Sequence, residues 1–319
     1  MATCNPVSPQ HSRDHEAFQR ARDLRLTSLV RLTHTAVLSV CLLGACTHYE
    51  SLEVDGVERE FLVHVPPGET PDQGWPLVLA YHGAYTTPEN TETYTGLSIL
   101  ADAEGFVVVY PRGKQRLWND GRVPDAYDDV AFTAALIDHL IDEYEVDEGR
   151  VFATGISNGA FMSHRVGCEL GDRIAGIAPV AGSLSEELLA VCEPVAPVPV
   201  MLVMGTEDRL VPYEGGSLGG GFVGGRIGTL LSGPQSAAHW AGLNGCDTEP
   251  VATERDELDD GTRLSSVEYH GCAAEVVFHT IDGGGHTWPG ARHVVGLGTV
   301  SAELDASAEI WRFFAAQGS

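Results

Sequence analysis

Short apolar runs alternate with helical stretches along most of the chain, and this alternation limits the possible folds more than any other feature. The runs PLVLAY at Pro76–Tyr81 and FVVVY at Phe106–Tyr110 have the composition of strands that are buried on both faces. Gly96–Glu104 has a helical pattern that ends at Gly105, and Asp128–Tyr144 gathers its apolar residues on one side of a helix. Strands that alternate with helices form a mostly parallel sheet covered by helices on both faces. We therefore predict an α/β fold.

The remaining elements fit the same plan. Further strands are expected at Arg150–Thr154, Ile174–Val180, Val198–Met204 and Glu275–Ile281, and further helices at Asn158–Leu170 and Ala302–Ala315. The dipeptide Asp55-Gly56 predicts a hairpin, which suits an antiparallel edge of the sheet. Gly215–Gly228 is rich in glycine and is expected to form a mobile loop. The chain has no internal repeat and no linker, so we expect one catalytic domain over residues 47–319.

Residues 1–46 have the pattern of an export signal. Arginines between positions 20 and 31 precede an apolar run, TAVLSVCLLGA, that is too short to span a bilayer, which takes about 20 apolar residues. The run ends in Leu-Gly-Ala before Cys46, which resembles a bacterial lipobox with Cys46 as the lipidated residue. A plain signal peptide is the alternative, and a true start near Val30 also fits. We predict an exported protein that is lipid-anchored at Cys46 or secreted.

Charge and cysteine content restrict the class of protein. The formal net charge of −26 repels phosphate backbones, so we expect no nucleic acid partner. Three of the seven cysteines lie in residues 1–46, which leaves an even four in the domain, as disulfides in an exported protein require. These four are Cys168, Cys192, Cys246 and Cys272. Four cysteines allow three connectivities, and buried free thiols are the alternative.

No cofactor or metal is expected. The chain has no C-x-x-C motif, the spacing that redox and zinc sites use. His279, His286 and His293 are spaced by seven residues, but no carboxylate or cysteine at a metal-ligand spacing accompanies them.

Two segments match the G-x-S-x-G pattern of a nucleophile elbow, GISNG at Gly155–Gly159 and GGSLG at Gly215–Gly219. An elbow requires a strand before the serine and a helix after it. Ser157 follows a predicted strand and precedes a predicted helix, and the Asn158 amide would then face an oxyanion at the helix N-terminus. Ser217 has neither neighbour and is interpreted as a loop serine.

The rest of a hydrolase site can be assembled in the chain order serine, acid, histidine. Asp208 follows the end of a predicted strand, with Glu207 as the local alternative, and His286 follows another strand in a glycine-rich loop. The HGAY segment after the strand PLVLAY supplies a second oxyanion donor, either Ala84 or Tyr85. This set predicts nucleophilic attack by Ser157 on an ester, with His286 as the base and Asp208 holding the imidazole.

These residues lie in segments that resemble the secreted esterases named for polyhydroxybutyrate depolymerase, a family that includes feruloyl and acetylxylan esterases. The segments are LVLAYHG, LADAEGFVVVYPRG, LWNDGR, DDVAFTAALIDHL, ATGISNGAFMSHRVGCEL, IAPVAG, VPVMLVMGTEDRLVPY and GGGHTWPG. The resemblance implies an α/β-hydrolase fold and the same catalytic serine, acid and histidine.

The resemblance has further implications for the pairing of the cysteines and for the substrate pocket. It implies the disulfides Cys168–Cys192 and Cys246–Cys272. It also implies that Trp118 and Trp288 line the acyl pocket, with Tyr85 beside them in the oxyanion loop. On the residues alone, each tryptophan could equally belong to the core.

Two departures from the family pattern bear on the substrate. Polymer-degrading members often have cysteine where this chain has Ala84, and they usually carry a linker and a separate substrate-binding domain, which this chain lacks. Soluble hydroxyalkanoate oligoesters, or feruloyl or acetyl esters of plant polysaccharide, are the expected substrates. The alternatives are a serine peptidase on the same fold and a non-catalytic surface lipoprotein.

Overall fold

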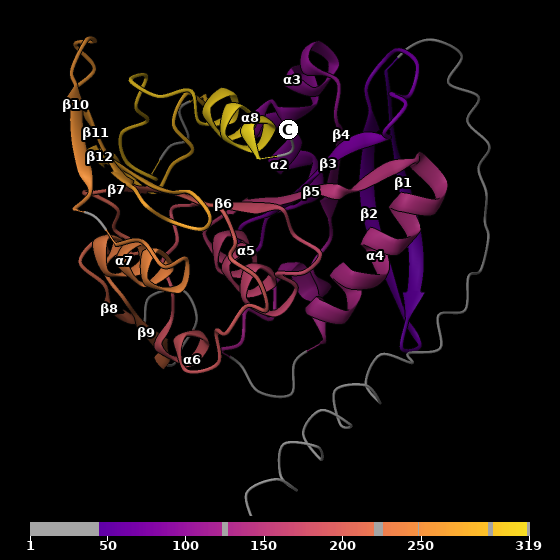
Figure 1. Ribbon diagram of the computed structural model, residues 1–319, viewed down its shortest axis with the longest axis horizontal. Helices are drawn as coiled ribbons and strands as arrows, with labels where there is room; N and C mark the ends of the chain where they lie inside the picture. The colour runs from indigo at the N-terminus through magenta and orange to yellow at the C-terminus, as the bar shows by residue number, and fades with distance from the viewer. Residues whose placement is uncertain (1–44, 123–126, 220–225, 248, 293–295, 318–319) are drawn as a thin grey trace, which may run out of the picture.

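Figure 1 shows the fold in a computed structural model, which describes residues 45–122, 127–219, 226–247, 249–292 and 296–317. The predicted signal segment, apart from Ala45 and Cys46, lies outside these residues. The strands of the main sheet are β1 (Cys46–Val54), β2 (Val57–Val65), β3 (Trp75–Tyr81), β4 (Val107–Pro111), β5 (Val146–Ile156), β6 (Gly176–Val180), β7 (Val200–Gly205), β10 (Val251–Arg255), β11 (Arg263–Tyr269) and β12 (Val276–Asp282).

The sheet has the order β1-β2-β4-β3-β5-β6-β7-β12-β11-β10. The strands from β4 to β12 in this order run parallel to one another. Antiparallel strands flank them on both sides, with the predicted hairpin β1–β2 at one end and β11–β10 at the other. The α/β prediction is therefore confirmed.

Helices cover both faces of the sheet (Figure 1). They are α2 (Pro88–Thr95), α3 (Leu97–Glu104), α4 (Asp129–Tyr144), α5 (Asn158–Glu169), α6 (Glu186–Leu189), α7 (Gly233–Leu243) and α8 (Ala306–Ala316). Helices α3 and α8 pack on one face, and α4, α5 and α7 pack on the other. Alternate residues of β3 serve the two cores: Leu77 and Leu79 contribute to one, and Val78 and Ala80 to the other. This explains why the strand is apolar throughout.

The structure corrects the interpretation of the glycine-rich segment as a loop. Gly216–Gly219 and Arg226–Leu230 form two short strands, β8 and β9, which pair with each other antiparallel. Ser217 lies in β8, opposite Thr229, and is not followed by a helix. Its position therefore agrees with its exclusion as an elbow serine.

The strands β10, at the edge of the sheet, and β11, between β10 and β12, were not predicted either. All five residues of β10 are exposed, and β11 buries only Leu264 and Ser266, so neither has the apolar run of a central strand. At the other end of the sheet, Cys46 begins β1 and pairs with Val65. In the part of the chain that the structure describes, no helix has the length and apolar character needed to cross a membrane.

Candidate active site

Three of the predicted functional residues follow neighbouring parallel strands at the same edge of the sheet. Ser157 comes directly after β5, Asp208 comes shortly after β7, and His286 comes shortly after β12. Strands β5, β6, β7 and β12 are consecutive in the sheet and parallel, so their carboxyl ends lie together. Open α/β sheets place their functional groups at this edge.

Ser157 occupies a strained turn between β5 and α5. Its φ is 59° and its ψ is −120°, a conformation that costs a non-glycine residue roughly 1–3 kcal/mol. The flanking glycines allow the turn: a Cβ on Gly155 would lie 2.6 Å from the carbonyl oxygen of Gly159, and a Cβ on Gly159 would overlap the carbonyl oxygen of Tyr81. The Ser157 amide donates to the carbonyl of Val180, 3.1 Å away, which fixes the turn against β6.

His286 is held by a buried carboxylate. Its Nδ1 lies 2.7 Å from Oδ2 of Asp208, whose side chain is fully buried. The other carboxylate oxygen of Asp208 accepts the backbone amides of Leu210 and Val211 at 2.8 and 2.9 Å. With the imidazole Nδ1–H donating to Asp208, Nε2 is left as the basic nitrogen. The neighbouring Glu207 is exposed and lines a groove instead, so the structure brings Asp208 and not Glu207 to the histidine.

The loop after β3 presents one free amide beside Ser157. The Tyr85 amide donates to the carbonyl of Arg116 at 2.8 Å, so it is not available to an oxyanion. Among the described residues, the amides of Ala84 and Asn158 have no hydrogen-bond partner. Gly83 lies against the serine, since a Cβ placed on it would be 3.6 Å from the Cβ of Ser157. Of the two amides considered from sequence, only that of Ala84 is therefore available to donate to an oxyanion.

The buried ring of His82 fixes this loop. Its Nδ1–H donates to the carbonyl of Gly83 at 2.8 Å, and its Nε2 accepts the amide of Gly113 at 2.9 Å. Burial lowers the pKa of His82 to about 4, so the ring is neutral at physiological pH and can accept and donate at the same time. His82 thus joins the oxyanion loop to the loop after β4.

Sequence reasoning missed the role of the Asn158 side chain. Its Oδ1 accepts the amide of Trp118 at 2.8 Å, and its Nδ2 donates to Oδ2 of Asp120 at 2.7 Å. Asp120 also forms a buried ion pair with Arg122 at 2.5 Å. These contacts anchor the elbow to the 118–122 loop and leave the Asn158 backbone amide free. Asp120, in the LWNDGR segment, was the available sequence clue to these contacts, but only the tryptophan of that segment was considered.

The two tryptophans expected at the acyl pocket are both core residues in this structure. Trp118 is 4% exposed, and its indole N–H donates to the carbonyl of His82 at 2.9 Å. Trp288 is 1% exposed, and its indole N–H donates to Ser307 at 3.0 Å. Each ring nitrogen is satisfied by the protein, so both tryptophans position loops around the site. The Tyr85 side chain, in contrast, is 39% exposed.

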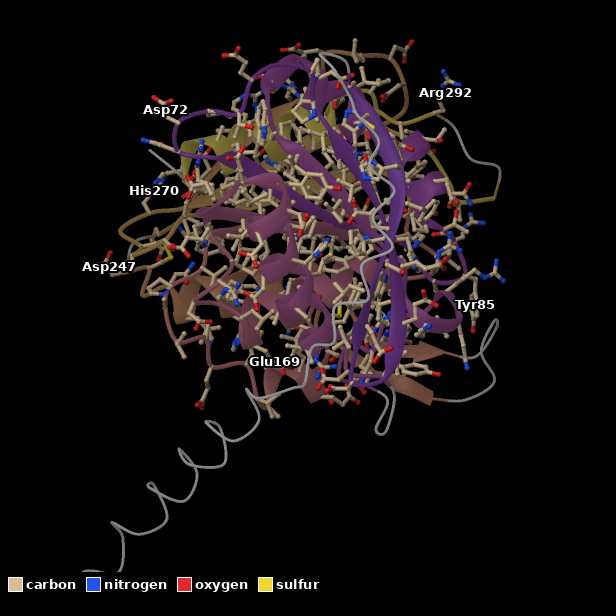
Figure 2. All side chains as sticks on the ribbon, turned by 90° about the vertical axis from the view of Figure 1, so that its right-hand side faces the viewer. Asp72, Tyr85, Glu169, Asp247, His270 and Arg292 are labelled. Atoms are coloured by element: carbon tan, nitrogen blue, oxygen red, sulfur yellow. A yellow bond between two sulfur atoms is a disulfide. The ribbon has the colours of Figure 1, made fainter. Side chains whose placement is uncertain are left out.

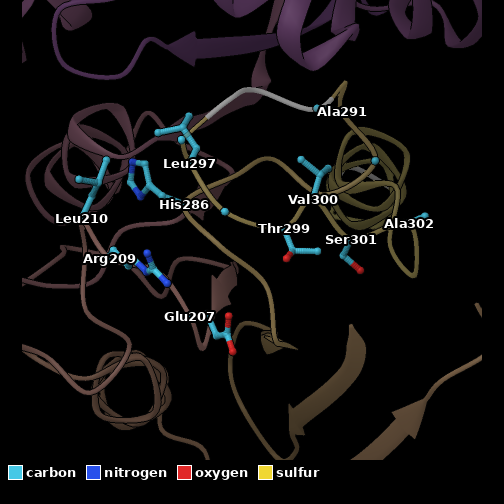
Figure 3. Close-up of a pocket in the computed structure, with 13 residues that line it drawn as sticks. Glu207, Arg209, Leu210, His286, Ala291, Leu297, Thr299, Val300, Ser301 and Ala302 are labelled. Atoms are coloured by element: carbon cyan, nitrogen blue, oxygen red, sulfur yellow. The ribbon is translucent and has the colours of Figure 1, made fainter. Parts of the chain in front are cut away.

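A groove adjoins His286 on the side of the β7 and β12 loops (Figure 3). Its volume is about 720 Å³. It is lined by Glu207, Arg209, Leu210, His286, Gly290, Ala291 and Gly296–Ala302. The imidazole of His286 therefore faces a space large enough for a substrate fragment.

The four domain cysteines form two disulfides. Cys168, near the end of α5, is bonded to Cys192, and Cys246 is bonded to Cys272. This is the pairing that the family resemblance implies, and disulfides fit an exported protein.

No group of three or more potential metal ligands occurs among the described residues. Of the three regularly spaced histidines, His279 is buried in β12 and lies 2.7 Å from the hydroxyl of Ser266. His286 is bonded to Asp208, and His293 lies outside the described residues.

Comparison with known proteins identifies the family. No protein-family model matches the chain. NocK of Nocardia uniformis subsp. tsuyamanensis, which is named as an esterase, is 32% identical over 262 residues, covering 77% of this chain and 75% of the relative. Feruloyl esterase B of Piromyces equi is 32% identical over 234 residues, covering 72% of this chain. The chain belongs to the feruloyl esterase and polyhydroxyalkanoate depolymerase family. It is a carboxylic-ester hydrolase.

Other relatives of this esterase extend the comparison. Poly(3-hydroxyalkanoate) depolymerase C of Paucimonas lemoignei is 27% identical over 175 residues and covers 52% of the chain. The chain spans 42% of the length of feruloyl esterase B and the same share of the depolymerase. Among solved structures, the acetyl xylan esterase from Aspergillus awamori has a TM-score of 0.57 at 14% identity, covering 81% of this chain and 94% of that one. This last likeness shows a shared α/β-hydrolase fold.

Proposed function

We propose that the protein is an exported serine esterase with Ser157 as the nucleophile, His286 as the general base and Asp208 as its partner. The observation that carries the proposal is the buried hydrogen bond of 2.7 Å between His286 and Asp208, at the same sheet edge as the strained elbow of Ser157. This hydrogen bond fixes the imidazole ring in the wall of the groove, where a substrate can reach it.

The reaction follows from these positions. Ser157 Oγ attacks the ester carbonyl while its proton passes to Nε2 of His286, and Asp208 stabilises the imidazolium that forms. The amides of Ala84 and Asn158 bind the oxyanion of the tetrahedral intermediate, and each such donor contributes roughly 3 kcal/mol. The imidazolium then gives its proton to the leaving alcohol oxygen. Water, activated by the same imidazole, cleaves the acyl-enzyme and regenerates Ser157.

The proposed substrates are soluble hydroxyalkanoate oligoesters, or feruloyl or acetyl esters of plant polysaccharide. The names of the relatives support both classes, because they include a feruloyl esterase, a bifunctional acetylxylan esterase/xylanase of Neocallimastix patriciarum and a poly(3-hydroxyalkanoate) depolymerase. A panel of methyl ferulate, acetylated xylan and hydroxybutyrate oligomers distinguishes them by initial rate.

Two substitutions test the catalytic assignment on p-nitrophenyl acetate. Ser157→Ala should remove the nucleophile, and Asp208→Asn should lower kcat by about 10⁴ because the imidazole is then held in the wrong tautomer. Circular dichroism checks that both variants fold. Full activity in the Ser157→Ala variant would disprove the assignment. Cleavage of peptide substrates by the wild type would favour a peptidase instead.

We also propose that the exported form carries a lipid on Cys46. Cys46 stands at the start of β1, so a chain that begins there keeps the whole sheet. Expression in a bacterial host tests this by partition into detergent. The wild type should enter the detergent phase and a Cys46→Ser variant should not, whereas equal partition of the two would exclude the anchor.

A further inference from the structure

Within the described part of this acidic protein, the cations that form no ion pair lie at the edge of the sheet that carries the candidate active site. Most of the arginines whose side chains the structure describes are paired with acids: Arg59, Arg112, Arg122, Arg150, Arg165, Arg173, Arg255, Arg263 and Arg312. Among the residues whose side chains the structure describes, the cations without an ion pair are Lys114, Arg116, Arg209 and Arg292. All four follow the carboxyl ends of β4, β7 or β12.

This placement is notable because the chain as a whole has a formal charge of −26. Arg116 is close to the oxyanion loop, since its carbonyl accepts the amide of Tyr85. Figure 2 shows Tyr85 and Arg292 on the same side of the molecule. Unpaired cations at one edge of an otherwise acidic surface offset the repulsion that a negatively charged substrate would meet there.

Arg209 is the cation best placed to touch a substrate. It lines the same groove as His286, and in Figure 3 its guanidinium lies between His286 and Glu207. It follows Asp208 directly in the chain, so the loop that fixes the imidazole also fixes the backbone of the arginine. The nearby Glu207 makes no ion pair with it among the described contacts. The guanidinium therefore remains available to a carboxylate.

The chemistry of ester cleavage says which part of the substrate enters this groove. His286 must give its proton to the oxygen of the leaving alcohol, so that oxygen lies next to the imidazole. The carbonyl oxygen points instead to the free amides of Ala84 and Asn158. The groove is lined by both His286 and Arg209, so it is the space beside the imidazole in which the alcohol portion of the ester would lie.

We propose that Arg209 forms a subsite for a carboxylate on the alcohol portion of the ester substrate. The inference rests on the proposed serine esterase mechanism and narrows its substrate class. A guanidinium can bind a carboxylate through two parallel hydrogen bonds, which fixes orientation as well as charge. Two sources supply this chemistry: the terminal carboxylate of a hydroxyalkanoate oligoester, and a uronic acid on an esterified polysaccharide.

Matched substrate pairs test the subsite. The first pair is the linear dimer of 3-hydroxybutyrate and its terminal primary amide, and the second is an acetylated xylo-oligosaccharide with and without a glucuronic acid substituent. The measurement is the ratio of kcat/KM for the charged and the neutral member of each pair. We expect wild type to favour the charged member of at least one pair, and that pair identifies the source of the carboxylate.

The substitution Arg209→Gln should lower this ratio by about 10- to 150-fold, the range expected when a hydrogen bond to a charged group is lost. Glu207→Gln should raise the ratio, because it removes a competing negative charge from the groove. Arg173→Gln is the control, since Arg173 pairs with Asp138 and precedes β6, at the opposite edge of the sheet. Its ratio should equal that of wild type. Added salt should shrink the preference of wild type, because it screens exposed charges.

A ratio at or below one for wild type in both pairs, or a ratio unchanged by Arg209→Gln, would overturn the subsite. Both results leave the esterase itself intact, because the neutral substrates are still cleaved. If the wild-type protein hydrolysed none of these esters, that result would instead contradict the proposed function. The two failures are therefore distinguishable in one set of assays.

Discussion

Two glycines make the position of Ser157 possible. The elbow brings the turn so close to β3 and α5 that any Cβ at Gly155 or Gly159 would meet backbone atoms. Backbone cannot move aside as the end of a flexible side chain can. The G-x-S-x-G pattern is thus a steric requirement of the strand-turn-helix connection. GGSLG matches the pattern but lies in paired β-strands, so its glycines do not serve such a turn.

A pair of glycine-to-alanine substitutions tests this requirement. Gly159→Ala should destabilise the protein by about 3 kcal/mol or more, because the new methyl group overlaps the carbonyl oxygen of Tyr81. Gly242→Ala should instead stabilise by roughly 0.5–1 kcal/mol, since Gly242 lies inside α7 with open space around its Cα. Urea denaturation measures both free energies of unfolding. Equal effects of the two substitutions would mean that crowding at the elbow is unimportant.

The residues around Ser157 show where sequence reasoning succeeded and where it could not. Ser157 could be chosen over Ser217 because strands and helices have periodic signals. Asp208 was preferred to Glu207 from the sequence, but only the structure shows which of the two adjacent carboxylates faces His286. Trp118 and Trp288 were expected at the pocket from the family resemblance, and their loop positions did not reveal that each ring points inward.

At the scale of elements, α5 connects the proposed nucleophile to the rest of the fold. Its first residue follows Ser157, and near its other end Cys168 is bonded to Cys192, beyond α6. The apolar strands and amphipathic helices were predictable from their patterns. The strands β8 to β11 were not, because β8 and β9 come from a glycine-rich segment, β10 is exposed throughout and β11 buries only two residues.

Removing the disulfide of α5 should weaken the fold more than the chemistry. The bond closes a loop with a sequence separation of 24, for which the chain-entropy estimate is about 3 kcal/mol. The double substitution Cys168→Ala and Cys192→Ala should therefore lower Tm by roughly 6–12 °C for a chain of this size. Calorimetry gives Tm, and p-nitrophenyl acetate hydrolysis at 25 °C should keep its wild-type KM. An unchanged Tm would show that packing alone holds the end of α5.

At the scale of the whole molecule, buried neutral histidines in distant parts of the core make the stability of the fold depend on pH. Burial lowers the pKa of His164 to about 3 and that of His82 to about 4. His164 accepts the indole N–H of Trp240 at 3.0 Å, which joins α5 to α7. Burial also lowers the pKa of His279, although the charge of Glu309 opposes the shift. These rings are neutral in the folded protein and protonate readily only when it unfolds.

Stability should therefore fall as the pH drops from about 6.5 toward 4. The unfolded chain takes up protons on these histidines near pH 6.5, whereas the folded chain does so only below about 4, so proton uptake favours unfolding in this window. Carboxylates protonate mostly below pH 5, so a comparison of Tm at pH 7.5 and pH 5 isolates the histidines.

The substitution His164→Gln should flatten this dependence, reducing the drop in Tm between pH 7.5 and 5 by roughly 2–6 °C, which corresponds to about 1–2 kcal/mol for one histidine. His270→Gln is the control, because His270 is exposed and lies at the surface in Figure 2. His279→Gln provides a second buried site should His164→Gln fail to fold. The idea is wrong if Tm falls between pH 7.5 and pH 5 by the same amount in wild type, in the buried-histidine variants and in the control.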